Sequence, residues 1–373
     1  MAAHPRAEVA VDLDAIRHNV ALLAARAGSA ATMAVVKADG YGHGAVPIAR
    51  AALQAGATWL GSCSLAEALA LRDAGIAAPI LSWLDPVGTD FASGVAAGVD
   101  LSASSTRELK AVVDGGRRAG RVPRVHLKID TGLARNGCPA AEWPDLVDAA
   151  AKAQADGHAE VVAVWSHLAC ADEPGHPSID AQADRFHTAH EQALAAGLRP
   201  LRHLANSAAT LSRPDLSFDL VRVGIAMYGL NPLPQHEDLR PAMTFRSSVA
   251  LTKRLPAGES VSYGQTWTAT KDTTVALVPA GYADGVPRLL SGNLDVWLAG
   301  RRRPVVGRVC MDQVVVDCGD DHVEPGTEVV LFGAGHEGGP TAREWADRLG
   351  TIDYEIVTGM YRPRVARTYL GAR

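Results

Sequence analysis

The sequence predicts an N-terminal (β/α)8 barrel followed by a C-terminal, mostly β domain, and three observations support this. Between residue 33 and about residue 229, short β-branched apolar runs alternate with amphipathic stretches, as expected of βα units. Eight such runs fit the roughly 200–250 residues of a TIM barrel. Beyond Pro241 the apolar runs are separated by Gly, Pro and Asp turns, which is typical of antiparallel β structure.

The barrel strands are predicted from their β-branched residues and from the helical patterns between them. Gly75, Gly120 and Gly197 each close a helical pattern as a C-cap,. An open doubly wound sheet is the alternative, but no Gly-x-Gly-x-x-Gly follows the first strand,. Strands are predicted over residues 33–36, 59–63, 79–84, 99–102, 124–130, 161–168, 202–206 and 220–225, and helices over 65–74, 106–119 and 180–196.

The boundary between the two domains is predicted between residues 231 and 241, where three prolines cluster. We expect residues 1–237 to form the barrel and residues 238–373 the β domain, with the extreme N-terminus as a candidate to pack with the second domain. Arg301–Arg303 is predicted as a turn. The β strands are predicted over residues 244–252, 273–278, 294–298, 304–309, 313–318 and 327–332, and a helical pattern returns only over 342–349.

Composition and charge exclude several classes of protein. The net charge is −5, with acidic and basic residues interspersed, which argues against an electrostatic nucleic-acid partner. No apolar run approaches the roughly 18 residues of a membrane helix, and the first residues contain no signal-like apolar segment,. Five scattered cysteines indicate reduced thiols. We expect a cytoplasmic protein with no nucleic-acid or membrane partner and no metal site.

Lys37 is the first candidate for chemistry, because the first predicted strand ends on it and opens into a glycine-rich loop. Barrel enzymes keep their active sites where strands end. A lysine there can form a Schiff base with an aldehyde such as pyridoxal 5′-phosphate (PLP), although spacing alone allows a solvated lysine equally well. Residues 35–44, VVKADGYGHG, closely resemble the cofactor-lysine signature of alanine racemases. The resemblance implies a PLP-binding barrel with Lys37 as the cofactor lysine.

A phosphate site is predicted after the seventh and eighth strands, where TIM barrels commonly bind phosphate. Ser207 follows strand seven, and Gly224 follows Arg222 in strand eight, where it would let the backbone approach an anion,. Taken singly, Ser207 suits a helix N-cap and Gly224 a packing glycine. The resemblance implies that Ser207, Gly224, Ile225 and Tyr41 hold the PLP phosphate.

The C-terminal tail departs from the family pattern. Racemases usually close with Tyr-Arg-Val-Pro-Arg, whose tyrosine adds a contact to the phosphate. Residues 360–367 here read MYRPRVAR, which puts Pro363 at the tyrosine position and Tyr361 two residues early. Tyr361 is therefore the candidate for that phosphate contact.

Arg222 is expected to point into the barrel mouth, where an arginine alone suggests a structural ion pair. The resemblance makes it the partner of the pyridine nitrogen. A guanidinium keeps its proton and donates to an unprotonated ring nitrogen. Such a ring is a weaker electron sink, which suits racemisation and discourages transamination.

Racemisation needs acid–base groups on both faces of the substrate Cα. Lys37 serves one face, and the resemblance implies Tyr263 for the other, with His167 as the histidine that contacts it. Ionising a free tyrosine at pH 7 costs roughly 4 kcal/mol, so neighbouring cations or donors must lower that cost. Without the resemblance, a strand aromatic and a buried core histidine would explain Tyr263 and His167 equally well.

The remaining candidates concern the substrate and the partner subunit. The resemblance implies a head-to-tail homodimer in which Tyr263 enters the neighbouring barrel, Met311 and Asp312 line the substrate's carboxylate side, and Tyr282 narrows the entrance. Cys310 borders this segment.

Lys128 lies near the end of the fifth predicted strand, and Arg135 follows that strand. Arg135 could bind the substrate carboxylate or the cofactor's phenolic oxygen. Lys128 stands where many racemases carry a CO2-carbamylated lysine, and a lysine in a barrel needs such neutralisation or a carboxylate partner. The sequence leaves both alternatives open.

The resemblance spans nearly the whole chain, and it implies a PLP-dependent alanine racemase that supplies D-alanine for peptidoglycan. A broad-specificity amino-acid racemase is the nearest alternative. A decarboxylase of the same architecture would need a carboxylate near the pyridine nitrogen and a glycine-rich phosphate loop, which Arg222 and Ser207 disfavour. A non-enzymatic PLP carrier would resemble the barrel alone.

Overall fold

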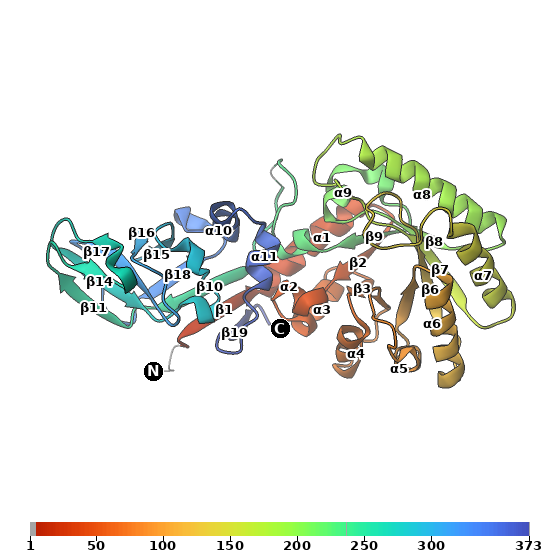
Figure 1. Ribbon diagram of the computed structural model, residues 1–373, viewed down its shortest axis with the longest axis horizontal. Coiled ribbons are helices and arrows are strands. Elements are labelled where there is room, and N and C mark those ends of the chain that lie inside the picture. Colours follow the sequence, from red (N-terminus) through yellow and green to blue (C-terminus); the bar gives the residue numbers. More distant parts are fainter. Residues whose placement is uncertain (1–4, 236, 373) are drawn as a thin grey trace. The chain divides into compact units, whose positions relative to one another are not determined.

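The structure is a computed structural model that describes residues 5–235 and 237–372 (Figure 1). The described chain divides into two compact units. The barrel unit comprises residues 16–40 and the described part of 44–239. The β unit comprises the described residues up to 15, residues 41–43 and the described residues from 240 onward.

The barrel unit contains the eight parallel strands that the sequence predicts. The sheet order is β8-β7-β6-β5-β4-β3-β2-β9. Its two ends meet where the N–H of Asp219 donates to Arg202 O (3.2 Å) and the N–H of Arg222 donates to Ala205 O (2.9 Å). The predicted fold class is therefore confirmed. The strands are β2 (Ala31–Val35), β3 (Trp59–Ser62), β4 (Ile80–Ser82), β5 (Asp100–Ala103), β6 (Arg124–Lys128), β7 (Glu160–Trp165), β8 (Leu201–His203) and β9 (Leu220–Val223).

Helices follow the strands and surround the sheet (Figure 1). Local signals fix their ends: Ser105 accepts a hydrogen bond from Glu108 N at the start of α6, and Gly120 ends that helix in the left-handed conformation at φ 64°,. The helices are α1 (Leu13–Ala27), α2 (Lys37–Tyr41), α3 (Ala45–Gln54), α4 (Leu65–Asp73), α5 (Phe91–Ala96), α6 (Thr106–Ala119), α7 (Trp143–Ala155), α8 (Ser178–Ala195) and α9 (Ser207–Ser212).

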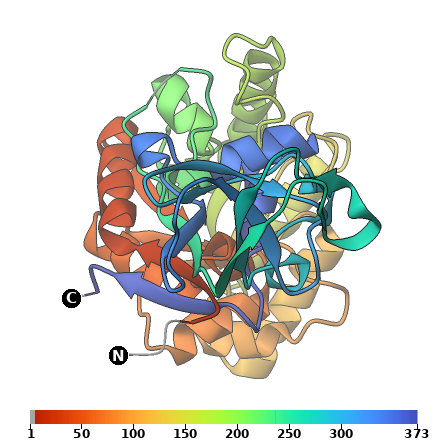
Figure 2. The same ribbon diagram turned by 90° about the vertical axis from the view of Figure 1, so that its left-hand side faces the viewer.

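The β unit is built on a nine-stranded sheet of order β11-β14-β17-β16-β15-β18-β10-β1-β19. The first and last strands of the chain lie side by side and parallel in this sheet, as the red and violet arrows of Figure 2 show. A separate hairpin pairs β12 (Ser260–Val261) with β13 (Trp267–Thr268). The other elements are β1 (Ala7–Asp12), β10 (Met243–Ser248), β11 (Leu251–Leu255), β14 (Thr273–Val278), β15 (Asp295–Leu298), β16 (Arg301–Val306), β17 (Val314–Gly319), β18 (Glu328–Phe332), β19 (Ala366–Leu370), α10 (Ala342–Leu349) and α11 (Asp353–Thr358).

The β unit corrects two details of the sequence prediction. The single strand expected over residues 244–252 is two strands, because Val249 N donates to Thr327 O while Ala250 N donates to Leu277 O, so the chain changes neighbours there. Arg301–Arg303 is not a turn but the start of β16. The turn lies just before it, at Ala299 and Gly300, which both have positive φ (51° and 78°),.

Five elements of the β unit were not anticipated from the sequence, namely β1, β12, β13, β19 and α11, and β1 and α11 are the most informative. Strand β1 pairs with β10 antiparallel and with β19 in parallel, and α11 follows α10 closely. Both owe their conformation to distant partners rather than to a long local pattern. Across the described ranges, no helix has both the length and the apolar character needed to cross a membrane.

Candidate active site

Lys37 lies directly after β2, at the start of a strained turn. Val36 N still donates to Gly61 O (2.8 Å) in the sheet, so the lysine leaves the end of the strand. The next three residues, Ala38, Asp39 and Gly40, are all left-handed, with φ of 52°, 52° and 63°. Non-glycine residues in this region cost about 1–2 kcal/mol each, so the surrounding structure must hold the turn in place.

Glu67 and Asp39 supply the hydrogen bonds that hold this turn. Glu67 Oε1 accepts from Ala38 N (2.8 Å), while its Oε2 accepts from Cys63 N (2.8 Å). Asp39 Oδ1 accepts from Ala45 N (2.9 Å). Glu67 was not singled out from the sequence, although Ser64 and Glu67 form a capping box at the start of α4, which a Ser-x-x-Glu spacing predicts.

The surroundings of Lys37 favour the neutral amine. Burial lowers the pKa of Lys37, the nearby cations Arg135 and Arg222 lower it further, and Cys63 and Glu67 raise it. A larger neutral fraction at pH 7 makes the amine a better nucleophile towards a carbonyl carbon.

Arg222 lies in β9, and most of the N–H groups of its guanidinium donate hydrogen bonds to protein acceptors. Nη1 donates to His203 Nδ1 (3.1 Å) and His203 O (2.8 Å). Nη2 donates to Ser166 O (2.8 Å), His167 Nδ1 (3.2 Å) and Leu204 O (3.1 Å). Among the described residues Nε has no hydrogen-bond acceptor, so one N–H remains to be given to a ligand.

Arg222 remains a cation at neutral pH. Burial lowers its pKa to about 9, and its five acceptors all favour the protonated guanidinium. His167 accepts from Arg222 at Nδ1, so its own proton is on Nε2, where it can be donated. Burial and the neighbouring cations hold the pKa of His167 well below its ordinary value, which keeps this imidazole neutral.

Lys128 lies at the end of β6 and is 2% exposed. Its Nζ donates to Asn136 Oδ1 (2.7 Å) and lies 4.0 Å from the centre of the Trp165 ring, over which Arg222 Cζ also lies at 4.8 Å. Burial, together with the charges of Arg222 and Arg135, lowers the pKa of Lys128 to about 7. A substantial neutral fraction of this amine therefore exists at physiological pH.

Basic groups outnumber acidic ones at this end of the barrel. Lys37, Lys128, Arg135 and Arg222 act on one another electrostatically, as the causes of their neighbours' lowered pKa values show. Asp130 is the acidic group that opposes the shift of Lys128. Four basic groups facing the two carboxylates of Glu67 and Asp130 leave an excess of positive charge that is suited to an anionic ligand,.

Ser207, Gly224 and Ile225 come together at two helix starts. Ser207 opens α9, and its Oγ accepts from Gly224 N (2.8 Å) and Ala226 N (3.3 Å) at the start of the 3-10 helix η2 (Ile225–Tyr228). Helix N-termini present backbone N–H groups that suit phosphate. The structure thus places the three predicted phosphate residues together, beside Arg222 in the chain.

The β unit brings its own candidates together around Cys310. Tyr282 N donates to Cys310 O (3.0 Å), and Ala283 N donates to Met311 O (3.0 Å). Ser262, next to Tyr263, contacts Cys310 through its Oγ (3.2 Å from Sγ). Three segments distant in sequence therefore form one group. Their large side chains stay in water in the single chain: Tyr263 is 72% exposed, Met311 51% and Tyr282 39%.

Asp312 is committed to ion pairs in this group. Its Oδ1 accepts from Arg364 Nη2 (2.7 Å) and lies 3.8 Å from Arg6 Nη2. Arg6 also pairs with Asp284 (3.2 Å), whose Oδ2 caps Gly281 N (2.9 Å) at the turn before Tyr282. Asp312 therefore anchors the segment that carries Met311.

Tyr41 is buried in the β unit, where its ring lies 6.2 Å from that of Tyr354 in α11. Gly42, at φ 81°, packs so tightly on Val357 O that a side chain there would clash. Tyr361 is instead 64% exposed, with Arg367 over its ring at 5.6 Å. The C-terminal tyrosine that accompanies Tyr41 is thus Tyr354, which the sequence analysis did not single out.

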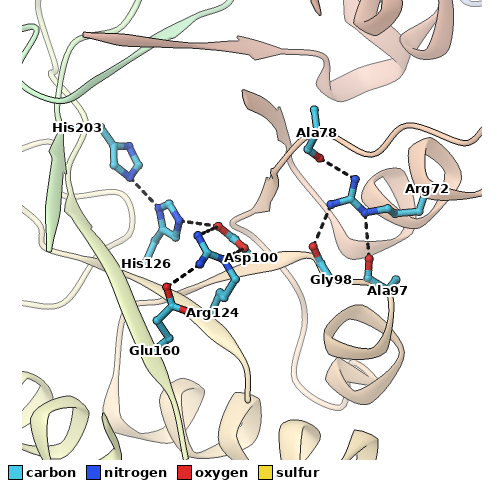
Figure 3. A network of polar contacts seen from close by, with 9 residues as sticks. All are labelled: Arg72, Ala78, Ala97, Gly98, Asp100, Arg124, His126, Glu160 and His203. Carbon is cyan, nitrogen blue, oxygen red and sulfur yellow. Dashed lines mark hydrogen bonds and ion pairs between the residues drawn. The ribbon is translucent and has the colours of Figure 1, made fainter. Parts of the chain in front are cut away.

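Other polar residues that the sequence analysis missed fill the barrel interior. His203 and His126 contact each other, and His126 contacts Asp100 (Figure 3). His203 also contacts Arg222. The available signal was a histidine inside an apolar strand pattern, which usually indicates a hydrogen-bonded core residue. No group of three or more His, Cys, Asp or Glu side chains in the described part of the chain is arranged to hold a metal ion.

Comparison with known proteins assigns both parts of the chain to one family. Residues 11–232 match the family model "Alanine racemase, N-terminal domain", and residues 242–369 match "Alanine racemase, C-terminal domain". An alanine racemase of Salinispora arenicola is 59% identical over 99% of each chain, and one of Thermobifida fusca is 54% identical over 98% of each.

Solved structures agree with these matches. The crystal structure of alanine racemase from D-cycloserine-producing Streptomyces lavendulae has a TM-score of 0.96 at 50% identity, covering 100% of this chain and 98% of that one. That of Bacillus anthracis alanine racemase with bound L-Ala-P has a TM-score of 0.89 at 35% identity, covering 100% of this chain and 97% of that one.

Proposed function

The chain belongs to the alanine racemase family, and on that premise we propose that it interconverts L-alanine and D-alanine with pyridoxal 5′-phosphate as cofactor. The observation that carries the cofactor proposal is the arrangement around Lys37. A half-buried amine of lowered pKa shares the barrel unit with Arg222, whose Nε–H is uncommitted among described residues.

The residues present fit a phosphorylated pyridine aldehyde. Lys37 offers the amine for its carbonyl carbon, and Arg222 Nε–H offers a donor for its ring nitrogen. Ser207 offers its hydroxyl proton and Ile225 its backbone N–H for the phosphate, while Gly224 N donates to Ser207 Oγ and so holds that hydroxyl in place; Tyr41 is a further phosphate donor. When bound, the cofactor supplies an electron sink that acidifies the Cα–H of an amino acid.

Arg222 favours racemisation over other reactions of the same cofactor. A guanidinium that already donates four N–H groups to protein acceptors stays protonated, so it cannot protonate the ring nitrogen and only hydrogen-bonds to it. No carboxylate of a described residue contacts Arg222. Since a decarboxylase of this architecture would place an acidic group at the pyridine nitrogen, this arrangement favours the racemase.

We propose that two bases act on opposite faces of the substrate Cα, Lys37 on one and Tyr263 of the partner subunit on the other. The exposure of Tyr263, 72% in the single chain, supports a head-to-tail homodimer in which this side chain enters the neighbouring barrel. His167 keeps its proton on Nε2 because Arg222 donates to Nδ1. That proton can be donated to the tyrosine oxygen, which stabilises the phenolate.

Arg135 is proposed to bind the substrate carboxylate, with Tyr282, Met311 and Asp312 of the partner subunit narrowing the pocket to a methyl side chain. Lys128 is proposed to carry a carbamate. Its neutral amine can add CO2 with loss of one proton, and the new carboxylate would oppose the positive charge of Arg135. The pKa of about 7 for Lys128 supports this, because only the neutral amine reacts.

Tyr354 is proposed to make the phosphate contact that was expected of Tyr361. Its packing against Tyr41 supports this role, to which the exposed Tyr361 is less suited. The cellular role proposed is the supply of D-alanine for peptidoglycan in the cytoplasm. The reduced state expected for the five scattered cysteines accords with that compartment.

The test is chiral chromatography after the PLP-loaded protein is incubated separately with L-alanine, L-serine, L-lysine and L-arginine. We expect alanine to approach an equal mixture of enantiomers while the others convert much more slowly. Fast conversion of the larger amino acids would establish a broad-specificity racemase instead. No conversion of any amino acid, despite bound PLP, would refute the proposal and favour a decarboxylase or a carrier.

A further inference from the structure

Arg222 is a buried cation, 4% exposed, whose direct acceptors are all neutral. Its counter-charge is reached through a series of hydrogen-bonded side chains across the barrel interior, and Figure 3 shows the part of this series from His203 to Asp100. Arg222 Nη1 lies 3.1 Å from His203 Nδ1, His203 Nε2 lies 2.9 Å from His126 Nδ1, and His126 Nε2 lies 3.2 Å from Asp100 Oδ2. Asp100 is the first residue of β5, at the opposite end of the strands from the cofactor lysine.

Only one arrangement of protons satisfies every contact in this chain. A guanidinium can only donate, so His203 Nδ1 must accept. Burial and the charge of Arg222 hold the pKa of His203 well below its ordinary value, so this ring is neutral and its single proton is on Nε2. His126 Nδ1 must therefore accept, and His126 donates from Nε2 to the Asp100 carboxylate. All three hydrogen bonds donate in one direction, from Arg222 to Asp100.

The opposite arrangement conflicts with Arg222. If His126 carried a proton on Nδ1, His203 Nε2 would have to accept, and the His203 proton would move to Nδ1. There it would face an N–H of Arg222, and two donors would oppose each other inside the barrel. A doubly protonated His126 would create the same conflict. The state of Asp100 thus decides whether the acceptor for Arg222 exists.

Asp100 is held as an anion at the far end. It is 1% exposed, and burial alone would raise its pKa. Hydrogen bonds and charges from His126 and Arg124 instead hold the pKa below its ordinary value. Arg124 Nε donates to Asp100 Oδ1 (2.8 Å), and Arg124 Nη1 also pairs with the exposed Glu160 (2.6 Å).

Aromatic rings fix the two imidazoles in place. The Trp165 ring stacks on His203 at 5.3 Å with an interplanar angle of 8°, and Trp59 meets His126 edge-on at 5.6 Å and 72°. Packed in this way, neither imidazole can turn over to exchange its donor and acceptor. The direction of the hydrogen bonds from Arg222 to Asp100 is therefore set by protonation alone.

We propose that Asp100, His126 and His203 are positioning residues that keep an acceptor before Arg222 and so aim its free Nε–H at the cofactor's ring nitrogen. This inference rests on the proposed function. A hydrogen-bond chain in a dry interior strengthens each of its members, so the Asp100 charge acts on Arg222 without touching it. The residues act through Arg222 and contact neither cofactor nor substrate.

A buried ion-pair network that only stabilises the fold is the competing explanation, and Asp100→Asn separates the two. An asparagine has one acceptor oxygen, which Arg124 Nε would take, leaving the amide N–H groups to face His126 Nε2. The imidazole protons must then reverse, as in the asparagine variant of the serine-protease triad. A purely structural network would lose stability without any ordered reversal.

Arg72→Met is the matched control. Arg72 is also a partly buried arginine of the barrel unit, and its charge acts on the same Asp100 neighbourhood. It donates to the carbonyls of Ala97, Ile76, Ala78 and Gly98 at 2.7–3.0 Å. It makes no hydrogen bond to Asp100, His126 or His203. Its loss should lower stability and leave the imidazole protons where they are.

The experiment is long-range ¹H–¹⁵N spectroscopy of the cofactor-free full-length protein with labelled histidine, with His126 and His203 assigned by single substitutions. In the wild type we expect both rings neutral and protonated on Nε2. In Asp100→Asn at least one ring should carry its proton on Nδ1, and the Kd for PLP should rise about tenfold, the loss of one hydrogen bond to a charged group. Arg72→Met should match wild type within about twofold in Kd.

Three outcomes would overturn the inference. The first is a wild-type spectrum with a proton on Nδ1 of either ring, which needs no variant to fold. The second is an Asp100→Asn protein with unchanged tautomers, and the third is reversed tautomers with a Kd equal to that of Arg72→Met. Failure of the wild type to bind PLP or racemise alanine would instead refute the proposed function, since the tautomers are measured without cofactor.

Discussion

Burial of Lys128 should make the cofactor-free protein less stable as the pH falls, and Lys128→Met should remove that dependence. The pKa of Lys128 is lowered from 10.5 to about 7, first by burial and then by the charges of Arg222 and Arg135. The unfolded chain therefore binds this proton more readily than the folded one. The penalty is fully present below the folded pKa, and it is relieved as pH rises from about 7 towards the unfolded value.

The size of the expected change in unfolding free energy follows from the pKa shift of Lys128. A difference of about 3.5 pKa values corresponds to about 5 kcal/mol at most, and because the side chain is 2% exposed, solvent screens little of it. Between pH 6 and pH 9 the titration releases only part of this penalty, about 2–3 kcal/mol. Methionine keeps the length of the lysine stem without its charge.

The assay is urea unfolding of the cofactor-free protein in CO2-free buffers between pH 6 and pH 9. We expect the free energy of unfolding of wild type, relative to Lys128→Met, to rise by about 2–3 kcal/mol over this range. Lys152→Met is the control, because Lys152 is exposed on α7 and pairs with Asp156 at 2.8 Å; it should show no such rise. Adding CO2 at pH 8 should stabilise the wild type only, if the carbamate forms.

A difference in unfolding free energy between wild type and Lys128→Met that stays constant with pH would refute the lowered pKa of Lys128. Such a result would mean that the amine keeps an ordinary pKa, through water or a counter-ion that reaches it. The proposed carbamate would then lose its supply of neutral amine.

Four further predictions concern the proposed catalytic groups and the turn beside them. Lys37→Ala should abolish covalent attachment of the cofactor, so borohydride reduction and mass spectrometry should label the Lys37 peptide of wild type and nothing in the variant; a labelled variant would contradict the assignment. Tyr263→Phe should keep the cofactor and lose about 10²–10⁴-fold in kcat for L-alanine, the usual contribution of a general acid or base, and a wild-type rate would remove this residue as a base. Mixing these two inactive variants should restore some activity if sites are shared between subunits, and no recovery in demonstrated heterodimers would argue against sharing. Glu67→Ala should lower the free energy of unfolding by about 1–3 kcal/mol because Ala38 N loses its acceptor, whereas Glu67→Gln should lose less; equal losses would show that the strained turn does not depend on this bond.

The residues that the sequence could identify stand at the ends of strands. Lys37, Ser207 and Arg222 were found because short β-branched apolar runs mark where strands end, the carboxyl ends of barrel strands share one face, and the surrounding residues resemble alanine racemase motifs. The parallel order of eight strands followed the same reasoning, and the structure confirms it. Local hydrophobic patterns carry this information, so no knowledge of distant contacts was needed.

The residues that the sequence could not identify depend on pairings across the barrel. His126 is opposite Ser102 and His203 is opposite Trp165 in neighbouring strands, but the contact between the two imidazoles exists only once β6 and β8 have both paired with β7. Similarly, Glu67 reaches Ala38 only because α4 lies beside the turn after β2.

The sequence by itself determined the fold class, the lysine-bearing strand end and the two loops suited to phosphate, because each is encoded in the spacing of adjacent residues. Only the tertiary structure decided the protonation and direction of the interior chain from Arg222 to Asp100, and the choice of Tyr354 beside Tyr41. The physical reason is that a buried side chain takes its charge and its donor or acceptor role from the groups around it. Those groups come from strands and helices far apart in the sequence.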